Sequence, residues 1–220
     1  EGGVPTLEMQ ILVPIQEHNE FDFNILEIAD RLKTDTAYIR LSHEAYGRDP
    51  DFYIITRSIA CFERTLISGE SCYDQFAFQG KSDAMTAAER RGMDLFFSEK
   101  TNCSQCHAGF NFSNYAFENN GLYENYPDPG RFRLTEDSSD IARFKVPTLR
   151  NVALTAPYMH DGSLLTLKSV VEHYNSGGKA HPHRSQLIRP LGLTTGEKAD
   201  LAAFLESLTD EKFVSNPKFK

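Results

Sequence analysis

Hydrophobic residues recur at helical spacing in two segments of the first third of the chain. Apolar positions three and four residues apart occupy residues 25–32, and the same pattern returns over residues 54–66. Positions separated by three or four residues share one face of an α-helix. Both segments are therefore predicted to be amphipathic or buried helices.

Two capping boxes mark the starts of later helices. Thr86 is followed three residues later by Glu89, and Thr194 is followed in the same way by Glu197. In this pattern each side chain bonds the backbone N–H of the other residue, which satisfies donors that the first turn leaves unpaired. The segment after Thr194 continues as an apolar stripe at helical spacing over residues 201–208. We expect a helix after each box.

A further capping residue, Thr166, opens a shorter segment that runs through Tyr174 and ends at the glycine pair 177–178. Between residues 111 and 147, Asn, Gly, Pro and Asp dominate without periodicity, which predicts a long surface loop. Loops of this length in compact domains tend to be functional. The fold is therefore predicted to be all-α with long loops.

The composition of the 220 residues is that of a globular protein, with 40% hydrophobic residues. No apolar run is long enough to cross a bilayer, and the first residues lack the basic and apolar regions of an export signal. The formal net charge of −8 argues against a nucleic-acid partner, because phosphate binding needs clustered Lys and Arg. An acidic surface suits a basic protein partner instead.

Cys103, Cys106 and His107 form a Cys-x-x-Cys-His motif, the attachment pattern of c-type haem. Two thiols about one helical turn apart meet the two vinyl groups of the porphyrin, and the adjacent imidazole reaches the iron. The alternatives are half of a zinc site or a dithiol redox pair. A zinc site needs a second pair of ligands, and the redox motif needs a βαβ context that this helical chain lacks. We predict covalent haem c at these three residues.

The other two cysteines, Cys61 and Cys72, have two alternatives. Their spacing allows a disulfide across a helix-to-loop turn, which would be stable only in an oxidising compartment. Two free, buried thiols are the equal alternative, because free cysteine is among the most buried residue types.

Several residues qualify as the second axial ligand of the iron. Met159 lies downstream of the attachment motif, and methionine ligation raises the reduction potential and suits electron transfer. Tyr174 would present an anionic oxygen that favours ferric iron. His160 and His173 are also eligible. The residue pattern by itself leaves this choice open.

Four strings of residues closely resemble bacterial di-haem cytochrome c peroxidases and the MauG-like enzymes of methylamine utilisation. They occur in the order of that family: FERTL at 62–66, the haem motif at 103–107, FKVPTLRN at 144–151 and TAPYMHDG at 155–162. The resemblance spans essentially the whole chain.

Members of this family normally have two haem domains, and the resemblance implies that the chain begins inside the first. Residues 1–69 are then the C-terminal part of an incomplete N-terminal, peroxidatic haem domain. Residues 70–209 form a cytochrome c-like haem domain, and residues 210–220 form a C-terminal tail. The first Cys-x-x-Cys-His and the tryptophan often found between the haems are absent from the sequence. We expect a fragment whose full-length protein carries a second haem.

The resemblance also implies an axial ligand set. In the peroxidases a methionine late in the corresponding helix binds the second iron, whereas MauG-like enzymes have a tyrosine there. The matching position is Tyr174, so the resemblance implies ligation by His107 and Tyr174, with Met159 as the alternative ligand. Arg150 and Lys145 are candidates to pair with haem propionates, and surface salt bridges are the alternative.

Further sites follow from the resemblance alone. Gln10, Pro14 and Glu20 match positions on the distal side of the first haem, where the glutamate is thought to help move protons. A structural calcium commonly lies between the two haem domains, bound partly by backbone carbonyls at the positions of Thr155 and Pro157. Calcium is therefore a candidate second cofactor.

The function that the resemblance implies is periplasmic reduction of hydrogen peroxide. Peroxide is cleaved at the first haem with Glu20 and Gln10 as distal groups, and electrons reach it through the haem of this chain from a small cytochrome c or another redox protein. The alternatives are MauG-like oxidation of a protein side chain and a non-enzymatic electron-transfer cytochrome ligated by Met159. We expect the chain to be inactive without its missing N-terminal haem segment. The oligomeric state stays open, with a homodimer as one alternative.

Overall fold

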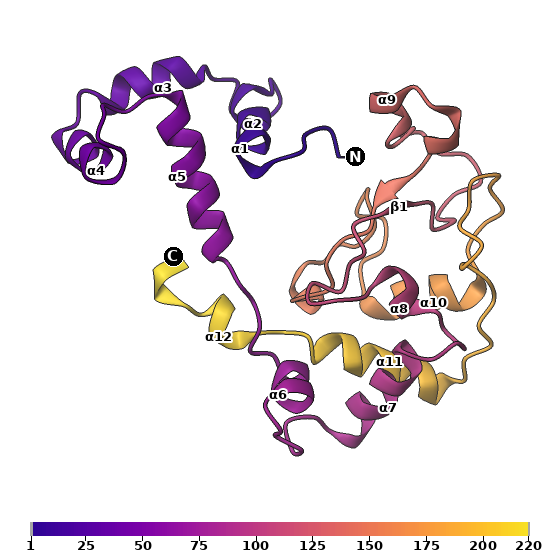
Figure 1. Ribbon diagram of the computed structural model, residues 1–220. Helices are drawn as coiled ribbons and strands as arrows, with labels where there is room; N and C mark the ends of the chain where they lie inside the picture. Colours follow the sequence, from indigo (N-terminus) through magenta and orange to yellow (C-terminus); the bar gives the residue numbers. More distant parts are fainter. Residues whose placement is uncertain (1, 220) are drawn as a thin grey trace. The chain divides into compact units, whose positions relative to one another are not determined.

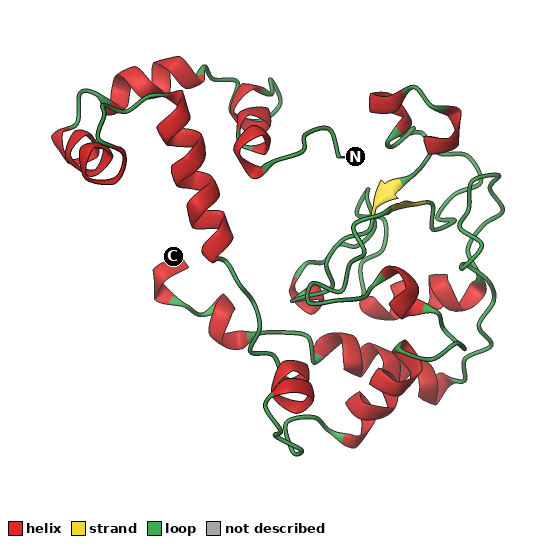
Figure 2. Cartoon of the chain, viewed as in Figure 1, coloured by secondary structure: helices red, strands yellow, loops and turns green. Residues whose placement is uncertain are grey.

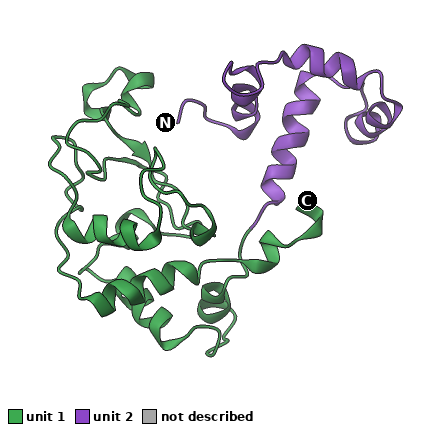
Figure 3. Ribbon diagram, turned by 180° about the vertical axis from the view of Figure 1, so that it is seen from behind, with its two compact units in different colours: residues 1, 68–220 green, residues 2–67 purple. Residues whose placement is uncertain are grey.

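The computed structural model describes residues 2–219, which form two compact units (Figure 3). Unit 2 comprises residues 2–67, and the described part of unit 1 comprises residues 68–219. Glu1 and Lys220 are the end residues of the segments expected at 1–69 and 210–220, and both lie outside the described residues. The described part of the expected tail belongs to unit 1.

Unit 2 is helical (Figure 1). Its helices are α1 (Leu7–Gln10), α2 (Leu12–Gln16), α3 (Ile25–Leu32), α4 (Thr36–Tyr46) and α5 (Phe52–Thr65). Ile25 and Ala29 of α3 pack against Ile55 of α5 in its core. The helices predicted from the apolar patterns at 25–32 and 54–66 are confirmed as α3 and α5.

Unit 1 consists of helices joined by long loops (Figure 2). Its α-helices are α6 (Cys72–Phe78), α7 (Ala87–Phe96), α8 (Cys103–Cys106), α9 (Phe132–Thr135), α10 (Leu167–Ser176), α11 (Thr195–Glu206) and α12 (Glu211–Val214). Its 3-10 turns are η1 (Ser138–Asp140), η2 (Val152–Leu154) and η3 (Pro217–Phe219). Both predicted capping boxes form, at the starts of α7 and α11. The helix predicted after Thr166 is α10, which Gly177 ends in a left-handed conformation.

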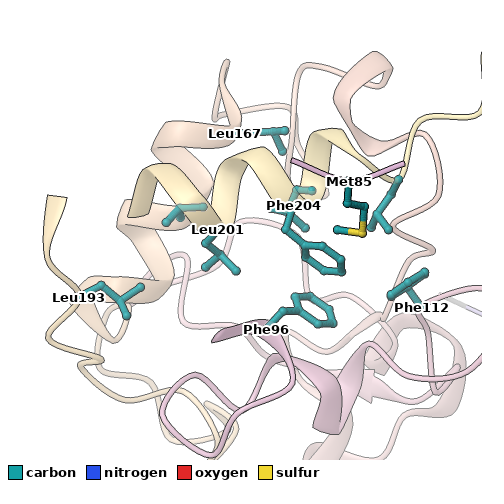
Figure 4. Close-up of a cluster of buried hydrophobic side chains, with 10 residues drawn as sticks. Met85, Phe96, Phe112, Leu167, Leu193, Leu201 and Phe204 are labelled. Atoms are coloured by element: carbon teal, nitrogen blue, oxygen red, sulfur yellow. The ribbon is translucent and has the colours of Figure 1, made fainter. Parts of the chain in front are cut away.

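The core of unit 1 lies where α7 meets α11 (Figure 4). Phe96 and Phe204 are buried there with their ring centroids 5.0 Å apart. Gly92 allows this close crossing, because a Cβ atom at its position would lie 1.9 Å from the carbonyl oxygen of Asp200. Helix α10 packs on α11 and adds Leu167 to the same core.

The segment predicted as a long loop contains only short elements. β1 (Phe117–Glu118) pairs antiparallel with β2 (Phe144–Lys145), and α9 and η1 lie between them in sequence. Side chains replace regular backbone pairing in this loop. The buried Asn119 accepts a hydrogen bond from the Gly121 N–H at 2.8 Å, and its amide bonds the His181 ring at 3.2 Å.

The described residues are mostly helical, as predicted from the sequence. Within residues 2–219, the structure has no helix that is both long and apolar enough to span a bilayer.

Candidate haem site

The predicted haem motif lines a cavity of about 430 Å³ in unit 1. Cavities that bind cofactors have volumes of roughly 300–1,000 Å³ and mostly apolar walls. The walls here are formed largely by apolar side chains from several elements, among them Phe96, Val146, Leu149, Leu167, Val171 and Leu201. Helices α8 and α10 both contribute to the lining (Figure 1). The cavity therefore suits a flat, apolar macrocycle.

The two thiols of the motif face this cavity from the ends of the single-turn helix α8. Asn102 precedes the helix in a left-handed conformation with φ 55°, which Asn tolerates better than most residues. Burial raises the pKa of both the Cys103 and the Cys106 thiol. Among residues 2–219, no group of three or more His, Cys, Asp or Glu side chains is gathered in an arrangement that holds a metal ion.

His107 directly follows α8 and also lines the cavity. Its Nδ1 lies 2.9 Å from the carbonyl oxygen of Phe112, so Nδ1–H donates and Nε2 carries the lone pair. Burial lowers the pKa of His107, although the carbonyls of Phe112 and Pro147 oppose this effect. A neutral imidazole with one nitrogen fixed by a carbonyl is the form that binds a metal ion. Together the thiols, the imidazole and the cavity fit a c-type haem.

The candidate second ligands Tyr174, Met159 and His160 all line the same cavity. Burial raises the pKa of Tyr174, and a hydrogen bond with the Asn120 side chain opposes this rise. The His160 ring stacks on Phe144 with centroids 3.9 Å apart. The structure thus brings together three of the four candidates that the sequence left open.

The fourth candidate, His173, has a different contact. Its Nε2 lies 3.0 Å from the carbonyl oxygen of Asn120. Because a carbonyl oxygen only accepts, Nε2–H donates to it. Burial lowers the pKa of His173.

Arg150 was a candidate to pair with a haem propionate, and that pairing stays a prediction. It is buried and pairs with Asp74 of α6, so the surface salt bridge expected as the alternative for Arg150 is wrong. Its guanidinium has donors directed at Asp74 and at the Phe110 carbonyl. Lys145 lines the cavity and is exposed, with its ammonium 5.1 Å from the ring centroid of Tyr115.

The residues matched to the distal side of a first haem lie in unit 2. Gln10 is the last residue of α1, and Glu20 lies in the turn after α2; both are exposed. The backbone N–H of Glu20 donates to the carbonyl of Glu17 at 3.0 Å. Thr155 and Pro157, which were matched to calcium-binding carbonyls, both line the cavity of unit 1.

The remaining cysteine pair fits neither alternative that the sequence left open. Cys61 lies in α5 and Cys72 begins α6. Both thiols are free and both residues are exposed. There is thus neither a disulfide nor a pair of buried thiols.

Sequence reasoning missed Asn119 and Asn120, which line the same cavity as the candidate ligands. They belong to a segment without hydrophobic periodicity, so no pattern singled them out. The one local signal is the Asn-Asn-Gly run itself, which is typical of a turn stabilised by side-chain bonds to the backbone.

Comparisons with known proteins identify the family of the chain. A family model described as di-haem cytochrome c peroxidase matches residues 1–83. The chain is 35% identical over 215 residues to the methylamine utilization protein MauG of Methylorubrum extorquens, covering 96% of this chain and 60% of that protein. It is 35% identical over 226 residues to cytochrome c551 peroxidase of Nitrosomonas europaea, covering 100% of this chain and 62% of that protein.

Solved structures show the same relationship. A crystal structure of a MauG-like protein associated with microbial copper homeostasis superposes with a TM-score of 0.90 at 36% identity, covering 100% of this chain and 75% of the other. The di-haem peroxidase BthA from Burkholderia thailandensis superposes with a TM-score of 0.77 at 21% identity over 97% of this chain and 66% of the other, which shows a shared fold. The chain spans about 60% of the length of the two relatives compared by sequence.

Proposed function

The chain belongs to the family of di-haem cytochrome c peroxidases and MauG-like proteins, and from this we propose that it forms part of a periplasmic enzyme that reduces hydrogen peroxide. Cys103, Cys106 and His107 would hold a haem c, which would supply electrons to a first haem site in the full-length protein. One observation carries the proposal: two thiols and an imidazole with a fixed tautomer line one apolar cavity. The electron donor is a small cytochrome c or another redox protein.

Bound haem c supplies reversible one-electron chemistry at its iron. The chain's own residues hold and orient the group. Cys103 and Cys106 provide the two thioether links, and His107 provides the proximal nitrogen. The Phe112 carbonyl fixes the ring of His107 by accepting from Nδ1–H, and Nε2 would then be the nitrogen that binds the group. The apolar walls exclude water from the haem faces.

At the first haem, Glu20 moves protons during peroxide cleavage and Gln10 provides a second polar group. A carboxylate within hydrogen-bond reach of peroxide can take a proton from one oxygen and deliver it to the other. This assignment is supported by the family match over residues 1–83, which includes both positions. A calcium bound partly by the carbonyls of Thr155 and Pro157 belongs to the same proposal.

A second candidate function is MauG-like oxidation of a protein side chain. The observation that favours it is Tyr174 in the lining of the cavity, because tyrosine ligation stabilises ferric and more oxidised iron. An electron-transfer cytochrome requires Met159 as the ligand instead. A stable oxidised species formed with peroxide in the absence of any reductant would support the MauG-like function over peroxide reduction.

Covalent attachment is tested by the haemochrome spectrum of the denatured protein after maturation with haem. Cys103→Ser should remove one thioether link and shift the haemochrome band, because one vinyl group stays unsaturated. Cys61→Ser is the matched control, since that thiol is exposed and free. Free Cys103 and Cys106 thiols in properly matured wild-type protein would refute the proposal.

The roles proposed for the two haem sites are tested by measuring peroxide turnover with an electron donor in the full-length, two-haem protein. Glu20→Gln should lower kcat/KM by roughly 10²–10⁴-fold, the range of a lost general acid–base group. Glu17→Gln, in the same exposed turn, is the control and should retain the wild-type rate. The chain loaded with one haem should show little peroxide turnover. Rates near those of the two-haem protein would contradict the roles proposed for the two sites.

A further inference from the structure

The side-chain amide of Asn120 contacts two of the candidate iron ligands. Its Nδ2 lies 3.3 Å from the Sδ atom of Met159, within hydrogen-bond distance for sulfur. The same side chain lowers the pKa of Tyr174 and so opposes the effect of burial on that phenol. All three residues line the cavity. One amide group therefore acts on both the Met159 thioether and the Tyr174 phenol, which are alternative ligands for the same position on the iron.

The orientation of this amide is fixed by its oxygen. Oδ1 accepts from the backbone N–H of Leu122 at 3.2 Å and from the Tyr126 hydroxyl at 3.5 Å. A backbone N–H is only a donor, so the amide oxygen has to face Leu122. The Nδ2 side of the Asn120 amide is consequently directed at Met159.

The backbone of Asn120 is tied to the helix that carries the tyrosine. Its carbonyl oxygen accepts from Nε2 of His173 at 3.0 Å, and His173 directly precedes Tyr174 on α10. This backbone contact keeps Asn120 close to the part of α10 that carries Tyr174. This arrangement positions the amide relative to α10 rather than relative to the exposed loop.

Met159 is also held in place. Its backbone is left-handed with φ 74°, which a residue with a long side chain rarely adopts. A backbone bridge between Tyr158 and Leu164 flanks it, with Tyr158 N–H donating to the Leu164 carbonyl at 2.6 Å. Strain of this kind persists only where the surroundings hold the residue. The bridge and the Asn120 contact together fix where the sulfur lies.

We propose that Asn120 is a positioning residue that selects Tyr174 over Met159 as the second axial ligand. Its Nδ2–H engages one lone pair of the sulfur and holds the thioether beside Asn120, while Tyr174 stays at the cavity wall to bind the iron. The inference rests on the proposed haem site. It adds that a neutral residue outside the haem motif decides the chemistry of that haem.

The test is ligand-field spectroscopy of the haem-matured protein. Asn120→Leu removes both N–H donors at similar volume. The variant should gain the near-infrared methionine-to-iron charge-transfer band and lose the tyrosine-type spectrum. Its reduction potential should rise, because methionine ligation raises the potential. Asn125→Leu, an exposed residue of the same loop, is the matched control and should keep the wild-type spectrum.

Two further variants keep the test decisive if the leucine variant folds poorly. Asn120→Asp keeps the acceptor oxygen for Leu122 but removes the amide donors, so it should also gain the methionine band. In Asn120→Leu combined with Met159→Leu, the band should disappear again. A tyrosine-type spectrum in either single variant with haem attached would overturn the selection by Asn120.

A wrong haem assignment would give a different experimental result from a wrong role for Asn120. Absence of a haemochrome in matured protein would refute the haem site and, with it, the selection. A methionine band in wild-type protein that carries haem would leave the haem site intact and refute the selection alone.

Discussion

Arg150 and Asp74 form a two-bond ion pair in the interior of unit 1, with Nη1 2.8 Å from Oδ2 and Nη2 3.0 Å from Oδ1. Their side chains are 4% and 3% exposed. The Nε–H of Arg150 donates to the Phe110 carbonyl at 2.7 Å, and its guanidinium lies 4.0 Å from the Phe110 ring centroid. The pair joins α6 to the loop after β2, whose residues 146–149 line the cavity.

Removing one partner of this pair should be strongly destabilising. Asp74→Ala leaves a buried guanidinium without a counter-charge, so we expect the free energy of unfolding to fall by about 3–5 kcal/mol. Denaturant-induced unfolding measures the change. Asp83→Ala, at an exposed position, should stay within about 0.5 kcal/mol of wild type. A loss from Asp74→Ala no larger than that of the control would contradict the assignment.

The stability of unit 1 should depend on Glu197 in acid. The hydrogen bond from Lys100, at 2.5 Å, and the N–H of Thr194 lower the pKa of Glu197 to about 2. Because the folded-state pKa lies below the ordinary 4.5, this stabilisation is fully present above pH 4.5 and is lost as the pH falls through about 2. The Tm difference between wild type and Glu197→Gln should therefore shrink in acid. A pH-independent difference would refute the linkage.

The close crossing of α7 and α11 predicts opposite outcomes for two glycine substitutions. Gly92→Ala places a methyl group 1.9 Å from the Asp200 carbonyl oxygen, so it should destabilise by roughly 1–3 kcal/mol or more. At Gly196, in the first turn of α11, the nearest atom would be 4.0 Å away. Gly196→Ala should be neutral or stabilise by about 0.4–1 kcal/mol. Thermal unfolding of both variants checks this, and equal effects would contradict the crossing.

Phe204 should be the most costly aromatic residue to truncate in unit 1. It is 0% exposed and its ring contacts those of Phe96 and Tyr73. Phe204→Ala should lower the free energy of unfolding by about 3–5 kcal/mol. Phe78→Ala is the matched control: that residue is 73% exposed and its edge contact with Tyr73 is worth at most about 1.5 kcal/mol. Similar losses in denaturant unfolding would refute this core.

Several features that depend on neighbouring residues were predicted correctly. The box of Thr86 with Glu89 formed, and so did the helix after Thr166, because each signal acts within a single turn of chain. The sequence missed the capping box of Ser71 with Asp74. Asp74 was assigned no role because its second partner, Arg150, lies 76 residues away.

The sequence by itself determined the helices with strong periodicity or caps, and it determined the spacing of Cys103, Cys106 and His107, since these depend on a few adjacent residues. Only the tertiary structure decided that Arg150 is an interior residue. It also decided that Asn120 meets both Met159 and the end of α10. Such contacts join segments about 40 or more residues apart, and the closure of long loops around a shared core fixes them. No pattern of adjacent residues in the sequence indicates how these loops close.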